Sequence, residues 1–553
     1  MDFNFLRNET IGYGSTIQTP FGTRLMTYAD YTASGKQLRF IENYILHLSE
    51  HYANSHTEDS YTGRRTTEYY HQAKEKMHQY LGANENYSIL PVGTGATAAI
   101  DKLSRILGIY ETPELLKQTK KELCSSNMPA YACDKPVVFI SSYEHHSNEL
   151  QWRLGYAEVV KIELTDEGLF DLNDLEHKLN LPVYKHRKKI GSFSAASNVT
   201  GIKTPVYEVA RLMHLHGGLV FFDFAASGPY VEINMTRDEN SYFDGIYLSL
   251  HKFLGGPGSS GLLVINNAVY PSKNIPTIAG GGTVTFVTED DQCFVDSYED
   301  REDAGTPGIF QVIRGALCLE VKHRLGQQAI SDREHALTRK GMEQLTTVPS
   351  IQVLGNLDPE NRVGIVSFVV KYKEAYLHHG FITTLINDLF GIQLRAGCTC
   401  AGPYGIKLLN IDDEHATKYK KAIMDGVHSM KPGWVRVNFH YTYDDETFNY
   451  IIKAILFAAE NAYLFLSDYE VDTLKGTWAK KGVAPQTKTL DIDHALVMDR
   501  LTLTSLDKNY SDLYEQYLQE ANLMKEERLA KPIDHELFAA KTMSDIAWFY
   551  HSK

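Results

Sequence analysis

Cysteine is scarce in this chain, and positive charge is in deficit. The 553 residues include 6 cysteines, and 55 lysines and arginines are outnumbered by 69 aspartates and glutamates, which gives a net charge of −14. So few cysteines in so long a chain fit a reducing compartment rather than a disulfide framework. Nucleic-acid binding usually leaves a basic footprint, so this balance argues against DNA or RNA as a partner.

Long apolar runs are missing as well. The longest are GGLVFF at 217–222 and GIVSFVV at 364–370, far below the ~20 residues that span a bilayer. The N-terminal MDFNFLRNET has no basic segment followed by an apolar stretch, so it is not typical of a secretory signal. We therefore expect a cytoplasmic protein with no membrane contact.

Hydrophobic residues make up 43% of the chain, enough for a large core, and this length predicts two to four domains. Short apolar runs alternate with helical periods between about 85 and 265, which predicts an α/β fold with a mostly parallel sheet. The predicted strands are residues 87–92, 136–142, 157–164, 189–196, 218–225, 245–250 and 260–265.

Changes of pattern divide the chain into four predicted regions. They are an N-terminal arm at 1–20, a large domain at 21–307, a smaller α+β domain at 308–470 and a helical C-terminal extension at 471–553. The polar stretch 111–135 is expected to be a surface insertion in the large domain.

The segment GIYLSLHKFLGGPGSSG, residues 245–261, places Ser249, His251 and Lys252 between a strand and a glycine-rich loop. Burying an ammonium group is costly, and desolvation lowers its pKa, so a buried lysine can become the neutral amine that forms an imine with an aldehyde. On this segment alone, a lysine that emerges into solvent is an equal alternative. A Walker loop is excluded because no Gly-Lys-Ser/Thr follows at the required spacing.

Asp223 ends the apolar strand of GLVFFDFAASG, 29 residues before Lys252. A buried carboxylate needs a cationic partner. The pyridinium nitrogen of pyridoxal 5′-phosphate (PLP) is such a partner, and its proton makes the ring an electron sink. The alternative is an aspartate that caps the next turn.

In PVGTGATAAID, residues 91–101, a strand ends in a Gly-Thr-Gly turn that opens a helix. The free N–H groups and the positive end of the helix dipole there favour a phosphate. The string GTGATA also matches the dinucleotide fingerprint G-x-G-x-x-A. An NAD(P)-binding oxidoreductase therefore stays a remote alternative.

Three further segments carry polar groups just after predicted strands. His145 in SSYEHHSNELQW can stack on a flat ring or move protons, and Asn198 in SAASNVTG can bind a ligand or simply form a turn. In IQLRAGCTCAGPYG, Arg395 can clamp a carboxylate, and Cys398 or Cys400 can act as a thiolate. A metal site is not expected, since zinc would need two more ligands and none is nearby.

In their order and spacing, these motifs resemble the class V aminotransferase family of PLP fold type I, from about residue 20 to 465. More narrowly, the RxGxxC loop is similar to that of the cysteine desulfurase and selenocysteine lyase branch. The resemblance implies a large domain with a mostly parallel seven-stranded sheet, a smaller α+β domain and a PLP-dependent transferase or lyase.

By that resemblance, Lys252 would be the Schiff-base lysine, Asp223 would pair with the pyridine nitrogen, and His145 would stack on the ring. The resemblance assigns the phosphate and hydroxyl contacts of the cofactor to Gly95, Ala96, Thr97, Ser249, His251 and Asn198. Thr306 resembles the position that reaches the neighbouring subunit's phosphate, which implies a homodimer with shared active sites.

The resemblance also implies the reaction. Arg395, with Asn198 and His56 nearby, would bind the amino-acid substrate, and Cys400 would take sulfur from L-cysteine as a persulfide, leaving alanine. A sulfur-acceptor protein is a candidate partner. Cys398 would be an additional thiol in the same loop.

The chain departs from the desulfurase pattern at Ala226, where the family commonly has a glutamine or histidine that contacts the ring's hydroxyl. The insertion and the C-terminal extension are also foreign to compact desulfurases. Other class V reactions therefore stay open: an aminotransferase, an amino-acid lyase or an epimerase that does not use the thiol. A non-catalytic descendant is disfavoured by the intact Lys252.

Overall fold

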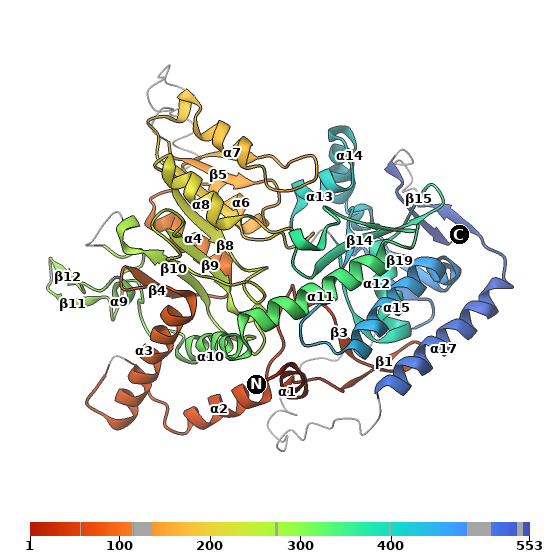
Figure 1. The fold of residues 1–553 in the computed structure, drawn as a ribbon, viewed down its shortest axis with the longest axis horizontal. Coiled ribbons are helices and arrows are strands. Elements are labelled where there is room, and N and C mark those ends of the chain that lie inside the picture. Colours follow the sequence, from red (N-terminus) through yellow and green to blue (C-terminus); the bar gives the residue numbers. More distant parts are fainter. Residues whose placement is uncertain are drawn as a thin grey trace. The chain divides into compact units, whose positions relative to one another are not determined.

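The computed structural model describes residues 1–55, 57–112, 114–115, 135–270, 275–397, 400–483, 510–538 and 546–552. His56, Cys398 and most of the predicted insertion at 111–135 lie outside these residues. The chain forms two compact units (Figure 1). Unit 1 contains residues 32–333 and 360–363, and unit 2 contains residues 2–31, 334–359 and 364–553.

Unit 1 is built on a seven-stranded sheet in the order β4-β10-β9-β8-β7-β5-β6. Its strands are β4 (Tyr87–Val92), β5 (Val137–Ser141), β6 (Glu158–Ile162), β7 (Lys189–Ser194), β8 (Leu219–Asp223), β9 (Gly245–Ser249) and β10 (Gly261–Asn266). β10 is antiparallel to both of its neighbours, β4 and β9, and the other neighbouring pairs are parallel. The predicted mostly parallel seven-stranded sheet is confirmed.

The sheet of unit 1 is buried on both faces, as its near-continuous apolar strands predict. All residues of β5, β7 and β9 are buried. One core cluster joins Ile100 and Leu103 of α4 (Ala96–Ile106), Trp152 of α6 (His146–Arg153), and Tyr247 and Leu263 of the sheet. Because these strands are parallel, their carboxyl ends lie at one edge of the sheet, where ligands bind in open α/β sheets.

The remaining elements of unit 1 surround this sheet. They are α2 (Arg39–Ser49), α3 (Tyr61–Leu81), α7 (Leu172–Leu179), α8 (Val206–Leu215), α9 (Tyr298–Arg301), α10 (Ile309–Leu325), the hairpin β11 (Val284–Val287) with β12 (Gln292–Phe294), and the 3₁₀ turns η2 (Pro182–Tyr184), η3 (Leu250–Lys252) and η4 (Asn267–Val269).

Unit 2 has a second sheet in the order β17-β18-β14-β15-β22-β21, with β13 beside β14. Its strands are β13 (Ile351–Val353), β14 (Ile365–Tyr372), β15 (Ala375–Leu377), β17 (Arg395–Gly397), β18 (Trp434–Asn438), β21 (His535–Leu537) and β22 (Phe549–Ser552). β22 runs parallel to β15, and the other pairs are antiparallel.

Helices and small two-stranded sheets complete unit 2. They are α1 (Phe3–Glu9), α12 (His379–Phe390), α13 (Gly402–Leu408), α14 (Asp413–Met424), α15 (Asp445–Asn461), α17 (Tyr510–Leu529), η6 (His428–Met430), η7 (Ala462–Asp468), and the pairs β1 (Thr16–Thr19) with β2 (Gly22–Leu25), β3 (Thr27–Tyr28) with β16 (Ile392–Gln393) and β19 (Tyr469–Asp472) with β20 (Thr477–Lys480). The division between the units falls inside α11 (Gln327–Leu345), and η5 (Pro359–Asn361) lies at a second crossing.

The compact units differ from the regions drawn from sequence. The proposed arm at 1–20 is part of unit 2, and α10 belongs to unit 1 although the smaller domain was drawn from residue 308. The C-terminal extension is not only helical, because β21 and β22 extend the sheet of unit 2. Local periodicity predicts the buried face of an element but not the partner that covers it, and this accounts for these differences.

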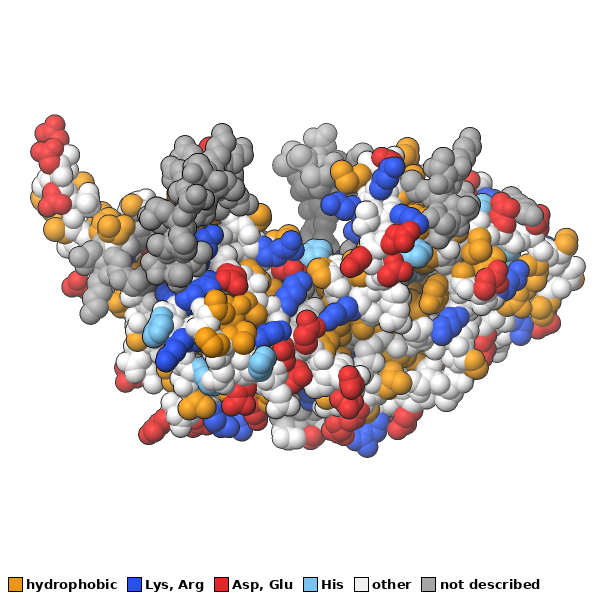
Figure 2. Space-filling view, turned by 90° about the horizontal axis from the view of Figure 1, so that it is seen from above, with side chains coloured by type: hydrophobic (Ala, Val, Ile, Leu, Met, Phe, Trp, Pro, Cys, Tyr) orange, Lys and Arg blue, Asp and Glu red, His pale blue; other side chains and the backbone are white. Residues whose placement is uncertain are grey.

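Among the described residues, one segment, residues 445–468, has the length and apolar composition of a membrane span, with a mean hydropathy of 1.3. Because 67% of that apolar window is buried inside the protein, the segment is typical of a core helix of a globular unit. Figure 2 shows positive and negative side chains of the described residues interspersed on the face in view.

Candidate active site

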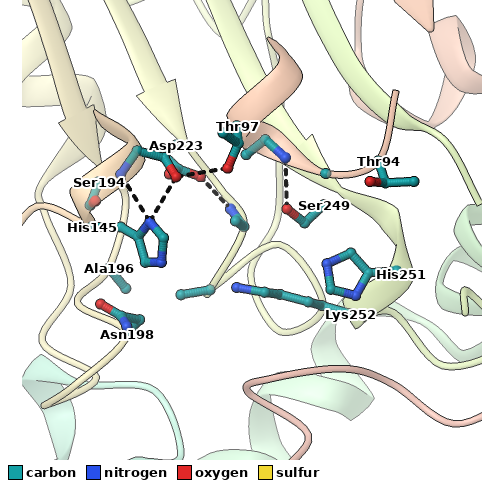
Figure 3. Close-up of a pocket in the computed structure, with 15 residues that line it drawn as sticks. Thr94, Thr97, His145, Ser194, Ala196, Asn198, Asp223, Ser249, His251 and Lys252 are labelled. Carbon is teal, nitrogen blue, oxygen red and sulfur yellow. Dashed lines mark hydrogen bonds between the residues drawn. The ribbon is translucent and has the colours of Figure 1, made fainter. Parts of the chain in front are cut away.

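A pocket of about 180 Å³ opens at the carboxyl ends of the parallel strands of unit 1 (Figure 3). It brings together the predicted cofactor residues of this unit except Thr306: Lys252, Asp223, His145, Asn198, Gly95, Ala96, Thr97, Ser249 and His251. Figure 3 shows the Lys252 side chain reaching across the pocket toward His145 and Asn198. Residues distant in sequence thus meet because each follows a strand of one parallel sheet.

The N-terminus of α4 forms an anion-binding end of this pocket. Gly95 is its N-cap, with φ +83°, and the Ala96 N–H donates to Ser249 Oγ at 2.9 Å. A Cβ on Gly95 would come within 3.1 Å of Ser249 Oγ and 3.7 Å of His251 Nε2. The glycine therefore keeps open a cradle in which helix N–H groups and a hydroxyl can face a phosphate. Burial and the charge of Lys252 lower the pKa of His251, which favours its neutral ring.

Asp223 gives the same pocket a buried carboxylate. Its side chain is buried at the end of β8, and burial raises the pKa of its carboxyl, while the Ala225 N–H at 2.8 Å and the charge of Lys252 oppose that shift. A buried carboxylate is stabilised by a cation held against it. The donor set thus matches the two ends of PLP, a phosphate at one and a protonatable ring nitrogen at the other.

His145 is held in one ring orientation by the start of α6. It is the N-cap of that helix, and the Ser147 N–H donates to its Nδ1 at 3.2 Å. Because Nδ1 accepts this hydrogen bond, the neutral ring carries its proton on Nε2. Ser147 Oγ lies 3.1 Å from Nδ1 and 2.7 Å from Thr97 Oγ1, so the ring is tied to the helix that forms the phosphate cradle.

Glu144, which sequence reasoning missed, fixes the loop behind His145. It is buried and accepts hydrogen bonds from the Ser141 N–H at 3.1 Å, the Ser194 N–H at 2.9 Å and Asn148 Nδ2 at 2.7 Å. Burial raises its pKa to about 7 against the opposing effect of these donors. An acidic residue immediately before the paired histidines was the available signal, but its partners lie up to 50 residues away.

Arg395 and Cys400 belong to unit 2, and the structure does not place them relative to the unit 1 pocket. Arg395 begins β17, and its Nε donates to Asp30 Oδ2 at 2.8 Å, while Arg436 Nη2 donates to Asp30 Oδ1 at 2.9 Å. Asp30 therefore orients Arg395, which stays 47% exposed. Cys400 is exposed, with φ 60°. Sequence reasoning missed Asp30, which lies 365 positions before its partner.

Two further predicted residues, Thr306 and His56, are not among the described residues that line the Lys252 pocket. Thr306 lines a separate cavity of unit 1, where Asn54 Nδ2 donates to its Oγ1 at 3.1 Å. His56 is outside the described residues. Ala226 lines the Lys252 pocket, so the predicted departure from the desulfurase pattern lies at the site itself.

Comparison with known proteins supplies independent information. The family model described as Aminotransferase class-V matches residues 119–443. A probable cysteine desulfurase of Streptomyces coelicolor is 23% identical over 391 residues, covering 69% of this chain and 85% of the relative. A probable cysteine desulfurase of Halalkalibacterium halodurans is 26% identical over 383 residues, covering 68% and 84%.

Solved structures share the fold. A cysteine desulfurase from Thermococcus onnurineus gives a TM-score of 0.62 at 22% identity and covers 79% of this chain and 95% of that one. A cysteine desulfurase from Escherichia coli gives 0.58 at 21% identity and covers 79% and 94%. The family match includes β17 and Cys400 and ends at residue 443, before α15 and the C-terminal strands.

Proposed function

Because this chain belongs to the aminotransferase class-V family, we propose that it uses PLP bound at Lys252 to remove sulfur from L-cysteine, releasing alanine and leaving a persulfide on Cys400. The observation that carries the proposal is the convergence of Lys252, Asp223 and His145 in one pocket of unit 1. The relatives described as cysteine desulfurases support the choice of substrate. The dinucleotide alternative gives no role to Lys252 or Asp223.

The pocket residues fit PLP in both charge and position. The N-terminus of α4 and Ser249 would hold the phosphate, Asp223 would hold a proton on the ring nitrogen, and His145 would lie against the ring. When bound, PLP supplies an electron sink for the charge that develops at the substrate's α-carbon. Lys252 Nζ, as a free amine, would accept the α-proton of the substrate as a general base.

Arg395 and Cys400 would act on the substrate from unit 2. The guanidinium of Arg395, oriented by Asp30, binds the α-carboxylate through charge-assisted hydrogen bonds. The Cys400 thiolate attacks the substrate's sulfur. A sulfur–sulfur bond forms, the substrate's Cβ–S bond breaks, and its electron pair stays with the carbon, which takes up a proton and leaves as alanine.

The proposal extends to assembly and location. We propose a homodimer in which Thr306 serves the neighbouring subunit, supported by its place in an adjoining cavity rather than in the Lys252 pocket itself. A protein that accepts the sulfur and a cytoplasmic location are part of the same proposal, supported by the exposed Cys400 and the scarcity of cysteine.

The test is to mix the purified, cofactor-loaded protein with L-cysteine and to measure alanine and protein-bound persulfide over the first turnover. We expect equal early amounts of both. Cys400→Ser should abolish the persulfide, while Cys293→Ser, which removes an exposed thiol on β12, should leave it unchanged. If neither product appears although the cofactor's absorbance shifts with amino acids, the desulfurase proposal fails and a thiol-independent class V reaction takes its place.

A further inference from the structure

The C-terminal strand β22 is built into the sheet of unit 2, beside the strand that leads to α12. Tyr376 pairs with Phe549 and Leu377 with Tyr550, and the Tyr376 N–H donates to the Trp548 carbonyl at 3.2 Å. Figure 1 shows the blue C-terminal strands beside β15. These residues lie beyond the family match, which ends at residue 443. They are therefore a feature of this chain rather than of the family model.

Trp548 joins this strand to the 428–434 segment through contacts on its ring. Its ring stacks on His378, with centroids 5.1 Å apart, and on His379, at 5.7 Å. Its Nε1–H donates to the Met430 carbonyl at 3.2 Å. The indole thus packs on two histidines and bonds to the backbone four residues before Trp434, which begins β18.

The two histidines are fixed in turn. His378 Nδ1 accepts from Trp478 Nε1 and from the Gly380 N–H, each at 3.0 Å, so its Nε2 carries the proton and donates to the Ser429 carbonyl at 3.2 Å. His379 Nε2 lies 3.3 Å from the Lys431 carbonyl. Together the histidines hold the chain from 429 to 431.

Gly433 and Trp434, which follow residues 429–431, contact residues on both sides of Cys400. A Cβ on Gly433 would lie 2.7 Å from His379 Nε2 and 2.8 Å from the Gly397 carbonyl carbon, so His379 and Gly397 close on Gly433 from two directions. Trp434 pairs with Gly397 in the sheet, and its ring would lie 2.6 Å from a Cβ on Gly405 in α13. Gly397 and the helix that follows Cys400 therefore rest on the same short segment, residues 433–434.

We infer that the C-terminal strand, through Trp548, is a positioning element for Cys400. The inference rests on the proposed function for the meaning of that thiol but not for the contacts. A displacement of about 1 Å in a reacting group can cost on the order of 10²-fold in rate. Cys400 is exposed and has a left-handed backbone, and we infer that its position depends on the support given to Gly397 and α13.

The test compares Trp548→Ala with Phe538→Ala in the full-length, cofactor-loaded protein. Phe538 stacks on Phe549 at 4.8 Å, so its removal also takes an aromatic ring from the C-terminal strands, but none of its ring contacts involves His378, His379 or Trp548. The variants and the parent protein all carry Cys398→Ser, and alkylation is measured separately at Cys400 and at Cys293. Trp548→Phe keeps the stacking and removes only the bond to Met430, so it should rescue part of the effect.

We expect Trp548→Ala to change the rate of Cys400 alkylation by iodoacetamide at least about fivefold and to slow persulfide formation roughly 10- to 100-fold. Alkylation of Cys293, the absorbance of the Lys252-bound cofactor and the KM for L-cysteine should stay within about twofold. If Cys400 alkylation is unchanged in Trp548→Ala, or changes equally in Phe538→Ala, the inference is overturned. If alkylation responds as expected but the parent protein forms no persulfide, the proposed function fails while the positioning stands.

Discussion

The Lys252 pocket of unit 1 and the Arg395–Cys400 segment of unit 2 differ in how far their functional side chains are exposed to solvent. Asp223 is 5% exposed, whereas Arg395 is 47% exposed and Cys400 is exposed. A cofactor whose ring must stay protonated is served by a desolvated carboxylate. A thiol that receives sulfur and passes it on needs access instead. Burial therefore characterises the pocket that we propose for the cofactor, whereas the thiol that we propose as the sulfur carrier is exposed.

The largest expected effect is that of Lys252→Ala, which should change the unit 1 pocket and leave unit 2 unchanged. Lys252→Ala removes the covalent anchor and the proposed base, so activity should fall by at least roughly 10²- to 10⁴-fold. Absorbance spectroscopy with borohydride reduction should find no cofactor attached to the protein. The alkylation rate of Cys400 should remain that of the parent protein, since unit 2 keeps its own contacts. A variant that still carries reducible cofactor would contradict the assignment of Lys252.

Asp223→Asn should act on cofactor affinity and apoprotein stability in opposite directions. Burial raises the pKa of this carboxyl, so its ionised form destabilises the apoprotein at pH values above the unfolded pKa, and the neutral amide relieves that cost. We expect apoprotein of equal or higher Tm at pH 7.5, together with PLP binding weakened roughly 10²-fold. Thermal melts and a PLP titration measure the two effects. Loss of Tm in the apoprotein would show that Asp223 is structural.

In unit 2, Asp30→Asn should weaken the orientation of Arg395. The loss of one charge-assisted hydrogen bond is worth about 1.5–3 kcal/mol, so we expect the KM for L-cysteine to rise about tenfold or more with a smaller change in kcat. Asp468→Asn is the matched control, because Asp468 pairs with Arg528 within the same unit. Equal effects of both variants on KM would indicate a general loss of stability rather than a role at Arg395.

The smallest effect is a difference in the pH dependence of the two units. In unit 2, burial lowers the pKa of His440 to about 3 and that of His378 well below its usual value, so their contribution is present above pH 6.5 and is lost as the pH falls. His440 alone should cost unit 2 about 2 kcal/mol at pH 5, because its ring is charged in the unfolded chain and neutral in the folded one. In unit 1, burial lowers the pKa of His214, but Asp244 outweighs this and raises it, so its contribution is present below pH 6.5 and is lost as the pH rises.

Hydrogen exchange at pH 5 and pH 7.5, corrected for intrinsic rates, measures this difference. We expect acid to lower protection in β14 and β18 of unit 2 more than in β7 and β8 of unit 1. His440→Gln should remove part of the acid sensitivity of unit 2. Parallel loss in both units, unchanged by the substitution, would contradict the contrast.

Sequence reasoning succeeded where a short stretch of chain carries its own signal. The strands of unit 1 are continuous apolar runs, and Lys252, Asp223 and His145 each follow one of them, so their convergence could be predicted. It did not find Asp30 or Glu144, because the importance of these carboxylates lies in distant partners. It also missed β22, a four-residue strand whose place depends on β15 more than 170 positions earlier.

Unit 2 contains residues from both ends of the described chain, and this determines which unit can fold first during synthesis. Arg24 donates to the Leu389 carbonyl 365 residues later, and β3 pairs with β16, so residues 2–31 wait for the later segment to be synthesised. At about 5–20 residues per second that wait is roughly 20 to 70 s. Unit 1 is nearly continuous from 32 to 333, so its pocket can fold and take up cofactor on the ribosome before Cys400 has been translated. The Lys252 pocket can therefore be complete before the thiol that we propose as the sulfur carrier exists.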